Sequence, residues 1–431
     1  MSLKKTLTRL ARQEGFIRRQ GKLTAFEFVL LMTVGQAALI HPSLAGLVEA
    51  IRGKISRVAL HGRFTHQAAE FLLSCLEMTL DYSARSAGIT PVALRPFPRV
   101  HIFDSSSWNI APGLKSVFKG CGGPGASGAG CKLQAGYEFK TGTLGFFSVT
   151  QGSQPDQTHG KNLVTFVGEG ELMLIDLGYF KLDTFEALTK KNAYFLSRFL
   201  FETTLWDATT LEKIDLERFL RNLDGNCLEM NVILCKDITR PPCRLIVLRV
   251  SEQVANARRR RLKAKAKERG RSPRQKTLTL CAWTLFVTNA PANRLPIETV
   301  RSLYRLRWQI ELVFKQLKSI LRIQVSHTTN EYRLRCELYG KLIMATLIHS
   351  LHSSLNAEWW RKTKKEVSFD KLYKRIQERA FMLFCNMLTS VGQALRQFVN
   401  EIRRIAHSCL KTRQSSRKTT LELLEDVGAF S

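Results

Sequence analysis

The sequence has few carboxylates for its size. Its 431 residues contain 36 Asp and Glu against 66 Lys and Arg, which gives a formal net charge of +30, and the isoelectric point is about 10.1. A surface with this excess of positive charge repels itself unless it meets a polyanion. We therefore expect nucleic acid as the partner, with a membrane surface as the alternative.

Long hydrophobic runs are also missing. The longest apolar run, residues 28–40, has 13 residues and contains Gln36, whereas a membrane-spanning helix needs about 20. The N-terminal segment MSLKKTLTRLARQEGF lacks the apolar core of a signal peptide. These absences argue against a membrane protein, and we expect a cytosolic one.

The sequence lacks the spacings of a zinc site and of a phosphate-binding loop. Its ten cysteines include no C-x-x-C pair, and several lie in apolar runs, as Cys75 and Cys281 do, which is typical of small buried side chains in a reducing compartment. The glycine-rich residues 120–130 are not followed by the required lysine and hydroxyl residue. We expect that segment to be a flexible connection.

The hydrophobic period changes along the chain, and it predicts an α/β protein of several domains. Residues 1–95 have a helical period and a capping-box pattern at Thr24 and Glu27, which suits either a DNA-reading module or a plain helical bundle. Period two dominates from residue 96 to 290, and helices follow. The predicted divisions are a helical DNA-end-binding domain (1–95), the first part of a catalytic core (96–190) and a β-rich insertion (191–294). A helix of the core (295–345) and a helical C-terminal region with a possible role in dimerisation (346–431) follow.

The densest positive charge lies in residues 258–276, between two strand patterns. These 19 residues contain eleven Lys or Arg and one Glu. Such a block is usually a disordered or solvated arm, and an arm of this charge suits contact with phosphates. The candidate DNA-binding residues at its start are Arg258, Arg259, Arg260 and Arg261.

Two aspartates stand at the ends of hydrophobic strand patterns. The segment RVHIFD ends at Asp104, and ELMLID ends at Asp176. A charged side chain in such a place is costly unless it has a partner or a function. A lone aspartate at the end of a strand is, however, also a common turn residue.

Residues 304–319 have the pattern of a single amphipathic helix. At about 100° per residue, four polar residues fall within an arc of roughly 60°, and the apolar residues form a separate stripe. The four are Tyr304, Arg307, Glu311 and Lys318. A solvated charged face is the simplest explanation of this helix taken alone.

A third carboxylate on this helix suggests a metal site. If the helix packs across a sheet that carries both aspartates, Asp104, Asp176 and Glu311 converge. Hard oxygen ligands suit Mg²⁺ or Mn²⁺. Two such ions about 4 Å apart activate a nucleophile on one side of a phosphodiester and stabilise the leaving oxygen on the other.

Taken together, these motifs resemble the DDE transposases of the insertion-sequence-four family. The family signature is Tyr, two residues, Arg, three residues, Glu, six residues, Lys, and the polar line of the helix matches it in full. The segments IFDSS and LIDLGYF look like the two aspartate motifs, and FVTNAP before the helix is also typical. The resemblance, which covers about residues 60–345, implies a ribonuclease H-like core with a β-strand insertion, flanked by helical N- and C-terminal regions.

The resemblance also implies roles for individual residues. Asp104, Asp176 and Glu311 would be the catalytic metal ligands, for two Mg²⁺ ions that Mn²⁺ can replace. The residues implied in DNA contact are Arg307 and Lys318, which would hold phosphates, Tyr304, which would contact a phosphate or the distorted DNA end, and Trp283, which would stack on a flipped base. Trp283 equally fits a core position, and we expect Trp308 to pack in the core.

The expected function is cut-and-paste transposition of a bacterial insertion sequence. The resemblance implies a homodimer that pairs the terminal inverted repeats, cleaves them through a DNA hairpin, and joins the freed ends to target DNA in the cytoplasm, on the nucleoid. One alternative is a catalytically idle or domesticated DNA-binding protein, although no carboxylate of the motif is missing. The other is a ribonuclease H-like nuclease that does not transfer strands.

Overall fold

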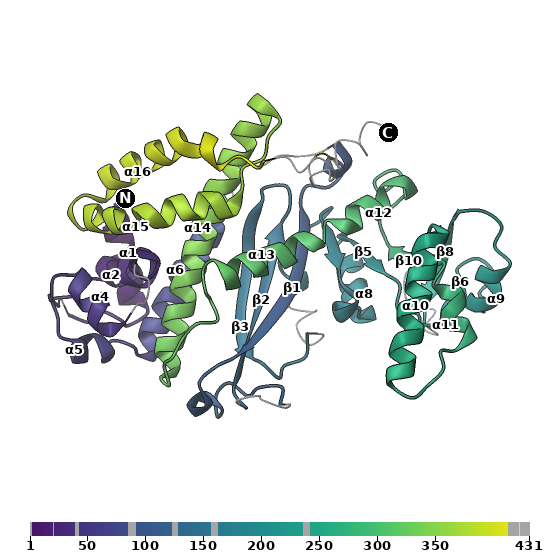
Figure 1. The fold of residues 1–431 in the computed structure, drawn as a ribbon, viewed down its shortest axis with the longest axis horizontal. Coiled ribbons are helices and arrows are strands. Elements are labelled where there is room, and N and C mark those ends of the chain that lie inside the picture. The colour runs from purple at the N-terminus through teal and green to yellow at the C-terminus, as the bar shows by residue number, and fades with distance from the viewer. Residues whose placement is uncertain are drawn as a thin grey trace. The chain divides into compact units, whose positions relative to one another are not determined.

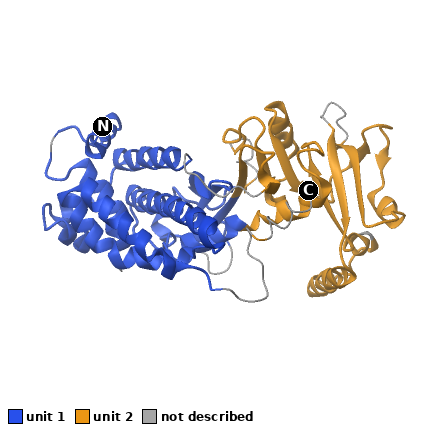
Figure 2. Ribbon diagram, turned by 90° about the horizontal axis from the view of Figure 1, so that it is seen from above, with its two compact units in different colours: residues 1–89, 104–154, 309–417 blue, residues 90–103, 155–308, 418–431 orange. Residues whose placement is uncertain are grey.

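The computed structural model has a mixed α/β fold, drawn in Figure 1. It describes residues 2–19, 21–38, 43–84, 92–122, 128–156, 163–235, 242–412 and 422. The chain divides into two units, coloured separately in Figure 2. Unit 1 comprises residues 1–89, 104–154 and 309–417, and unit 2 comprises residues 90–103, 155–308 and 418–431.

Unit 2 is built on a sheet of mostly buried strands. Its elements are the first half of β1 (Val100–Asn109), β4 (Leu172–Ile175), β5 (Tyr194–Arg198), β6 (Leu205–Asp207), β7 (Lys213–Ile214), β8 (Cys227–Leu234), β9 (Cys243–Arg249), β10 (Trp283–Thr288), η2 (Val92–Leu94), η5 (Leu177–Tyr179), α8 (Leu182–Lys190), α9 (Leu216–Arg221), α10 (Glu252–Glu268), α11 (Gln275–Leu280) and α12 (Ile297–Arg305). Strands β1, β4 and β5 run parallel, and β10 is antiparallel to β5. All four residues of β4 are buried, as expected for a central strand covered on both faces.

Asn289, just after β10, joins that strand to β5. Its Oδ1 accepts a hydrogen bond from the Phe195 amide at 2.8 Å, and its Nδ2 donates to Thr189 Oγ1 at 3.0 Å and to the Ala193 carbonyl at 2.8 Å. The asparagine of the FVTNAP segment therefore satisfies backbone groups that would otherwise lack partners.

Unit 1 consists of helices and a β-hairpin. Its elements are α1 (Leu3–Gln13), α2 (Ala25–Leu30), the π-helical turn η1 (Leu31–Gly35), α3 (Gln36–Ala38), α4 (Leu44–Ala50), α5 (Arg57–His61), α6 (His66–Ser83), the second half of β1, η3 (Pro112–Leu114), β2 (Gly130–Glu138), β3 (Thr143–Gln151), α13 (Trp308–Ser319, whose first residue lies in unit 2), α14 (Glu331–Thr363), α15 (Phe369–Thr389), α16 (Val391–Ile405) and η6 (Ala406–Cys409). The capping box of Thr24 and Glu27 is present, and the core contains fully buried Phe28 and Phe71.

The strand order confirms the predicted fold class. The hydrogen-bonded order is β3-β2-β1-β4-β5-β10-β9-β8-β6-β7. Its first five strands have the order of a ribonuclease H-like core, with the β2–β3 hairpin followed by parallel β1, β4 and β5. Strands β6 to β9 lie in the sequence between the two core segments, as the predicted insertion does. Of the helices in the described ranges, none has both the length and the apolarity needed to cross a membrane.

The helix predicted over residues 304–319 is wrong as a single element. The chain forms α12 and α13, with a turn at residues 306 and 307. There the amides of Leu306 and Arg307 bond to carbonyls three residues earlier, at 2.9 Å and 3.1 Å, which is the tighter pattern of a 3₁₀ turn. Both helices bury one continuous apolar stripe, so the hydrophobic period gives no signal of the turn.

The first part of the basic block forms a helix, which contradicts the predicted disordered arm but agrees with a solvated one. Residues 252–268 form helix α10, which buries only Ala255. Alanine, lysine and arginine have high helix propensity, and this outweighs the repulsion that suggested a disordered arm. The helix ends before Gly270, whose φ of +61° and amide bond to the Lys267 carbonyl are typical of a helix C-terminus.

The glycine-rich segment is held at both ends. The Gly120 amide bonds to the Gly128 carbonyl and the Gly130 amide to the Phe118 carbonyl, each at 2.9 Å. The middle of the predicted flexible connection, residues 123–127, lies outside the described residues.

A close contact between α14 and η1 makes a testable prediction. A Cβ at Gly340 would lie 2.0 Å from the Met32 carbonyl oxygen, whereas a Cβ at Gly392, in α16, would meet nothing within 4 Å. We expect Gly340→Ala to lower the free energy of unfolding by about 1–3 kcal/mol or more, because backbone must move. Gly392→Ala should raise it by up to about 1 kcal/mol. Urea denaturation of both variants measures this, and equal effects would contradict the helix contact.

Candidate active site

Asp176 lies at the end of β4, where it caps η5. Its Oδ2 accepts a hydrogen bond from the Gly178 amide at 3.3 Å, and its Oδ1 lies 3.2 Å from Nε of Arg307. About a third of its side chain (35%) is exposed. The carboxyl ends of parallel strands are where open α/β sheets bind ligands, so this aspartate is well placed for chemistry.

Tyr304 is buried and attaches α12 to the same strand end. Its hydroxyl donates to the Ile175 carbonyl at 3.3 Å, and its ring centroid lies 5.2 Å from that of Phe286. Burial, reinforced by the nearby charge of Asp176, raises the pKa of Tyr304 to about 12. The hydroxyl is therefore a neutral donor at physiological pH, and its DNA contact stays a prediction.

Arg198, which sequence reasoning missed, stands beside Asp176. In the parallel pair β4–β5, Ile175 is opposite Ser197, so the next residues, Asp176 and Arg198, adjoin on one face. The half-buried Arg198 guanidinium also acts with burial to lower the pKa of Arg258. A usable signal was present in the sequence, because YFLSR is another buried strand that ends in a charged residue.

Asp104 lies within β1 and does not end it, contrary to the sequence prediction. The strand continues to Asn109, but its burial changes at Asp104, with residues 100–103 buried and 104–106 half-buried. The serines that follow have short side chains that tolerate partly solvated strand positions, so the strand continues after its hydrophobic run stops. Oδ1 of Asp104 accepts a hydrogen bond from the Ser105 amide at 2.8 Å.

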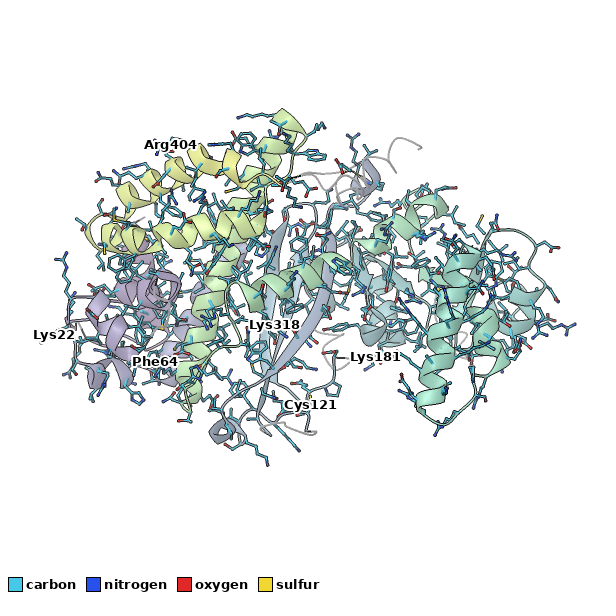
Figure 3. All side chains as sticks on the ribbon, in the orientation of Figure 1. Lys22, Phe64, Cys121, Lys181, Lys318 and Arg404 are labelled. Carbon is cyan, nitrogen blue, oxygen red and sulfur yellow. The ribbon has the colours of Figure 1, made fainter. Side chains whose placement is uncertain are left out.

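Helix α13 carries Glu311 and lies beside the second half of β1. Lys318, labelled in Figure 3, donates from Nζ to the Ser107 carbonyl at 3.4 Å and lies 6.0 Å from the centroid of the Trp108 ring. Burial lowers the pKa of Lys318. Glu311 is exposed in the first turn of the helix, where the helix dipole favours a negative charge.

The three carboxylates are of the right type for a hard divalent cation. Asp104 and Glu311 belong to unit 1 and Asp176 to unit 2. Within the described ranges, no three His, Cys, Asp or Glu side chains are grouped so that they could hold a metal ion. Their convergence stays a prediction, and one oxygen of Asp176 already faces Arg307.

The solvent exposure of two tryptophans does not fit their predicted roles. A residue that stacks on a base should be exposed, and a core residue should be buried. Trp283 is 3% exposed and is covered by the Arg249 guanidinium, 4.6 Å from its ring centroid. Trp308 is 56% exposed, so the prediction that it packs in the core is wrong. The core position of Trp308 was inferred from one continuous helix, and the turn before α13 interrupts that helix. Stacking of Trp283 on a base stays a prediction that requires the ring to be uncovered.

The four arginines at the start of the basic block differ in their surroundings. Arg258 donates to the Trp283 carbonyl at 2.8 Å and to Thr284 Oγ1 at 3.0 Å. Arg259 pairs with Glu252 at 2.7 Å. Arg260 and Arg261 are exposed. Arg258 therefore fixes α10 to β10, Arg259 is engaged within its own helix, and the last two are accessible to phosphates.

Comparison with known proteins gives consistent matches. The transposase DDE domain family matches residues 95–347. The chain is 26% identical over 450 residues to the transposase of insertion sequence element IS231F of Bacillus thuringiensis subsp. israelensis, covering 99% of this chain and 93% of that protein. It is 26% identical over 444 residues to the IS1151 transposase of Clostridium perfringens, covering 97% and 93%. The piggyBac transposase synaptic complex with hairpin DNA has a TM-score of 0.45 and 12% identity, covering 97% of this chain and 84% of that one.

The two tryptophans provide a matched test of this geometry. We expect Trp283→Ala to lower the free energy of unfolding by about 3–5 kcal/mol, because it opens a cavity in the sheet core. Trp308→Ala should change it by less than about 0.5 kcal/mol, as exposed substitutions do. Chemical denaturation gives both values, and acrylamide should quench less of the total fluorescence once Trp308 is removed. A large loss of stability in Trp308→Ala would contradict its exposed position.

Proposed function

This chain belongs to the transposase DDE domain family, and from that premise we propose that it is the transposase of a bacterial insertion sequence. Its substrates would be the terminal inverted repeats of the element and a target DNA. The net charge of +30 suits both, because counterion release from phosphates favours binding by a basic protein. The cytoplasm, on the nucleoid, is the proposed location.

One observation carries the proposal. Three of the four signature residues each contact one of the two aspartate strands. Tyr304 bonds to Ile175, the residue before Asp176, and Arg307 pairs with Asp176 itself. Lys318 bonds to the carbonyl of Ser107, three residues after Asp104. The signature therefore ties the helices α12 and α13 to the strands that carry the aspartates, which supports a joint catalytic role.

We propose that Asp104, Asp176 and Glu311 together hold the divalent metal that the family implies, as two Mg²⁺ ions that Mn²⁺ can replace. Bound metal would supply an activated nucleophile and stabilise the leaving oxygen. The protein's own cations would position the DNA. Arg307 would exchange its bond to Asp176 for a backbone phosphate, and Lys318 would hold a second phosphate. Such contacts fix the scissile bond without reading sequence.

The proposed reaction is cut-and-paste transposition. Water cleaves one strand at the element's end, and the freed 3′-hydroxyl attacks the opposite strand to close a hairpin. Water then reopens the hairpin, and the 3′-hydroxyl joins target DNA. Each attack by water breaks one phosphodiester bond and leaves a 5′-phosphate and a 3′-hydroxyl, whereas each attack by a 3′-hydroxyl breaks one phosphodiester bond and forms another. A homodimer would pair the two ends, and the exposed Phe381 and Met382 of α15 and Leu395 of α16 are available for that contact. Retention of all three carboxylates disfavours a DNA-binding protein without catalysis.

The test of catalysis uses Glu311→Gln with DNA that carries the inverted repeats, in Mg²⁺. We expect the variant to bind the repeats as wild type does and to cut them more than about a hundredfold more slowly, because a metal ligand is removed. Glu298→Gln is the matched control, since it changes an exposed glutamate in the first turn of α12 and should leave cleavage unchanged. Cleavage by Glu311→Gln at the wild-type rate would refute the catalytic assignment. Cleavage by the wild type with no joined product would identify a nuclease without strand transfer.

The role of α10 can be measured separately through salt dependence. Replacing Arg260 and Arg261 by Gln should weaken binding to every DNA sequence. It should also reduce the slope of log affinity against log salt by up to about 2, roughly 0.9 for each phosphate that the helix no longer neutralises. The control replaces Lys365 and Lys374, which are also exposed, and should leave the slope nearly unchanged. Equal slopes in the two variants would show that α10 is a solvated helix that does not touch DNA.

A further inference from the structure

Unit 1 contains a cavity that none of the proposed catalytic residues lines. Its volume is about 650 Å³, within the range of sites that bury small organic molecules. It is lined by residues of the N-terminal helices, of the segment directly after α13, and of α14 and α15. The lining residues that matter for its chemistry are Gln36, Leu44, Arg57, Arg322, Lys341 and Tyr373.

The wall of this cavity has an excess of positive charge. Arg57, Arg322, Arg333 and Lys341 face a single carboxylate, Glu337. Glu337 is already engaged by Arg333, whose Nε lies 2.8 Å from Oε1, and by the Ser326 hydroxyl at 2.7 Å. No carboxylate of the described ranges pairs with Arg57 or Arg322. The cavity therefore favours an anion.

Lys341 is held with its ammonium group at the cavity wall. Its Nζ donates to the carbonyls of Arg322 at 3.0 Å and Val325 at 2.8 Å, which leaves one of its three N–H donors for an occupant. Burial, with a contribution from Arg322, lowers the pKa of Lys341 to about 8, despite the opposing charge of Glu337. An anion beside Nζ would favour its charged form.

Gln36 supplies a neutral polar group in the same cavity. It is 8% exposed, and its Oε1 is buried without a hydrogen-bond partner in the structure. Its Nε2 reaches only the thioether sulfur of Met32, at 3.7 Å, which is a weak acceptor. A buried amide without good hydrogen-bond partners lowers stability. An occupant that both donates and accepts hydrogen bonds would remove that cost.

We propose that this cavity binds one nucleotide. The phosphate would lie among Lys341, Arg322 and Arg57, whose positive charges are opposite to its own and which can donate hydrogen bonds to it. The base would lie against the apolar wall formed by Leu44, Met344 and Tyr373, and the Gln36 amide would bond to its edge, as amides do to bases elsewhere. The nucleotide is either the terminal residue of a DNA strand or a free nucleotide, and only the DNA source rests on the proposed function.

Binding here would act on the segment that follows the catalytic helix. Arg322, three residues after the end of α13, has a φ of +50°, a left-handed conformation that is costly for a residue with a side chain. Its carbonyl is fixed by Lys341. A phosphate on both side chains would reinforce this turn and thereby the position of α13, which carries Glu311.

The experiment measures binding to the full-length protein by calorimetry. The probes are dAMP, dCMP, dGMP and dTMP, a short 5′-phosphorylated single strand, and inorganic phosphate as the anion without a base. We expect Gln36→Leu to weaken nucleotide or strand binding about tenfold, since the occupant can no longer bond to a buried amide, and to leave thermal stability equal or higher because a buried unpaired amide is removed. Arg57→Gln should weaken binding similarly, whereas Arg396→Gln, outside the cavity, should not.

The outcomes distinguish the two sources and the two proposals. Binding of free nucleotides that Gln36→Leu weakens identifies a free nucleotide as the occupant, and binding of the strand alone with the same sensitivity identifies a DNA terminus. Inorganic phosphate binding as tightly as the nucleotides, or equal affinities in wild type and Gln36→Leu, would overturn the proposal. Cleavage assays on the inverted repeats test the transposase function independently. A protein that binds nucleotides but cuts no DNA would retain the cavity assignment and lose the function.

Discussion

The attachment of α12 to the end of β4 is the constraint on which the candidate site depends. Tyr304 donates to the carbonyl of Ile175 from a buried position, and Arg307 pairs with Asp176 one residue further on. The chain turns between these two residues and the start of α13. Because the turn follows so closely on two fixed side chains, contacts to an aspartate strand determine where α12 ends.

Much of the fold could be predicted from the sequence, because its signals are local. The buried strand of residues 172–175 is a continuous apolar run, and the Thr24 capping box is a pattern of four residues. The turn between α12 and α13 was not predictable, since both helices bury one stripe and neither Gly nor Pro interrupts it. The exposure of Trp308 follows from that turn, so one missed feature produced two errors.

The candidate site was predictable in its residue types but not in its neighbours. The spacing of the signature identified Arg307 and Lys318, but it could not show that one pairs with Asp176 and the other with the backbone of Ser107. Arg198 was missed because its importance arises from strand register, which places it next to Asp176. Register depends on which strands pair, and a single sequence does not state that. The cavity around Gln36 could not be predicted for the same reason, since its lining comes from six separate stretches of the chain.

Helix α10 combines two opposite responses to ionic strength. Only Ala255 is buried, so the helix receives little support from packing, and like charges four residues apart, such as Arg261 and Lys265, repel each other. Added salt screens that repulsion and therefore favours the helical form. The same salt competes for the phosphates that such a helix suits. The ionic conditions that best order α10 in the free protein are thus those in which it binds DNA least, and DNA itself is the polyanion that can order the helix and occupy it at once.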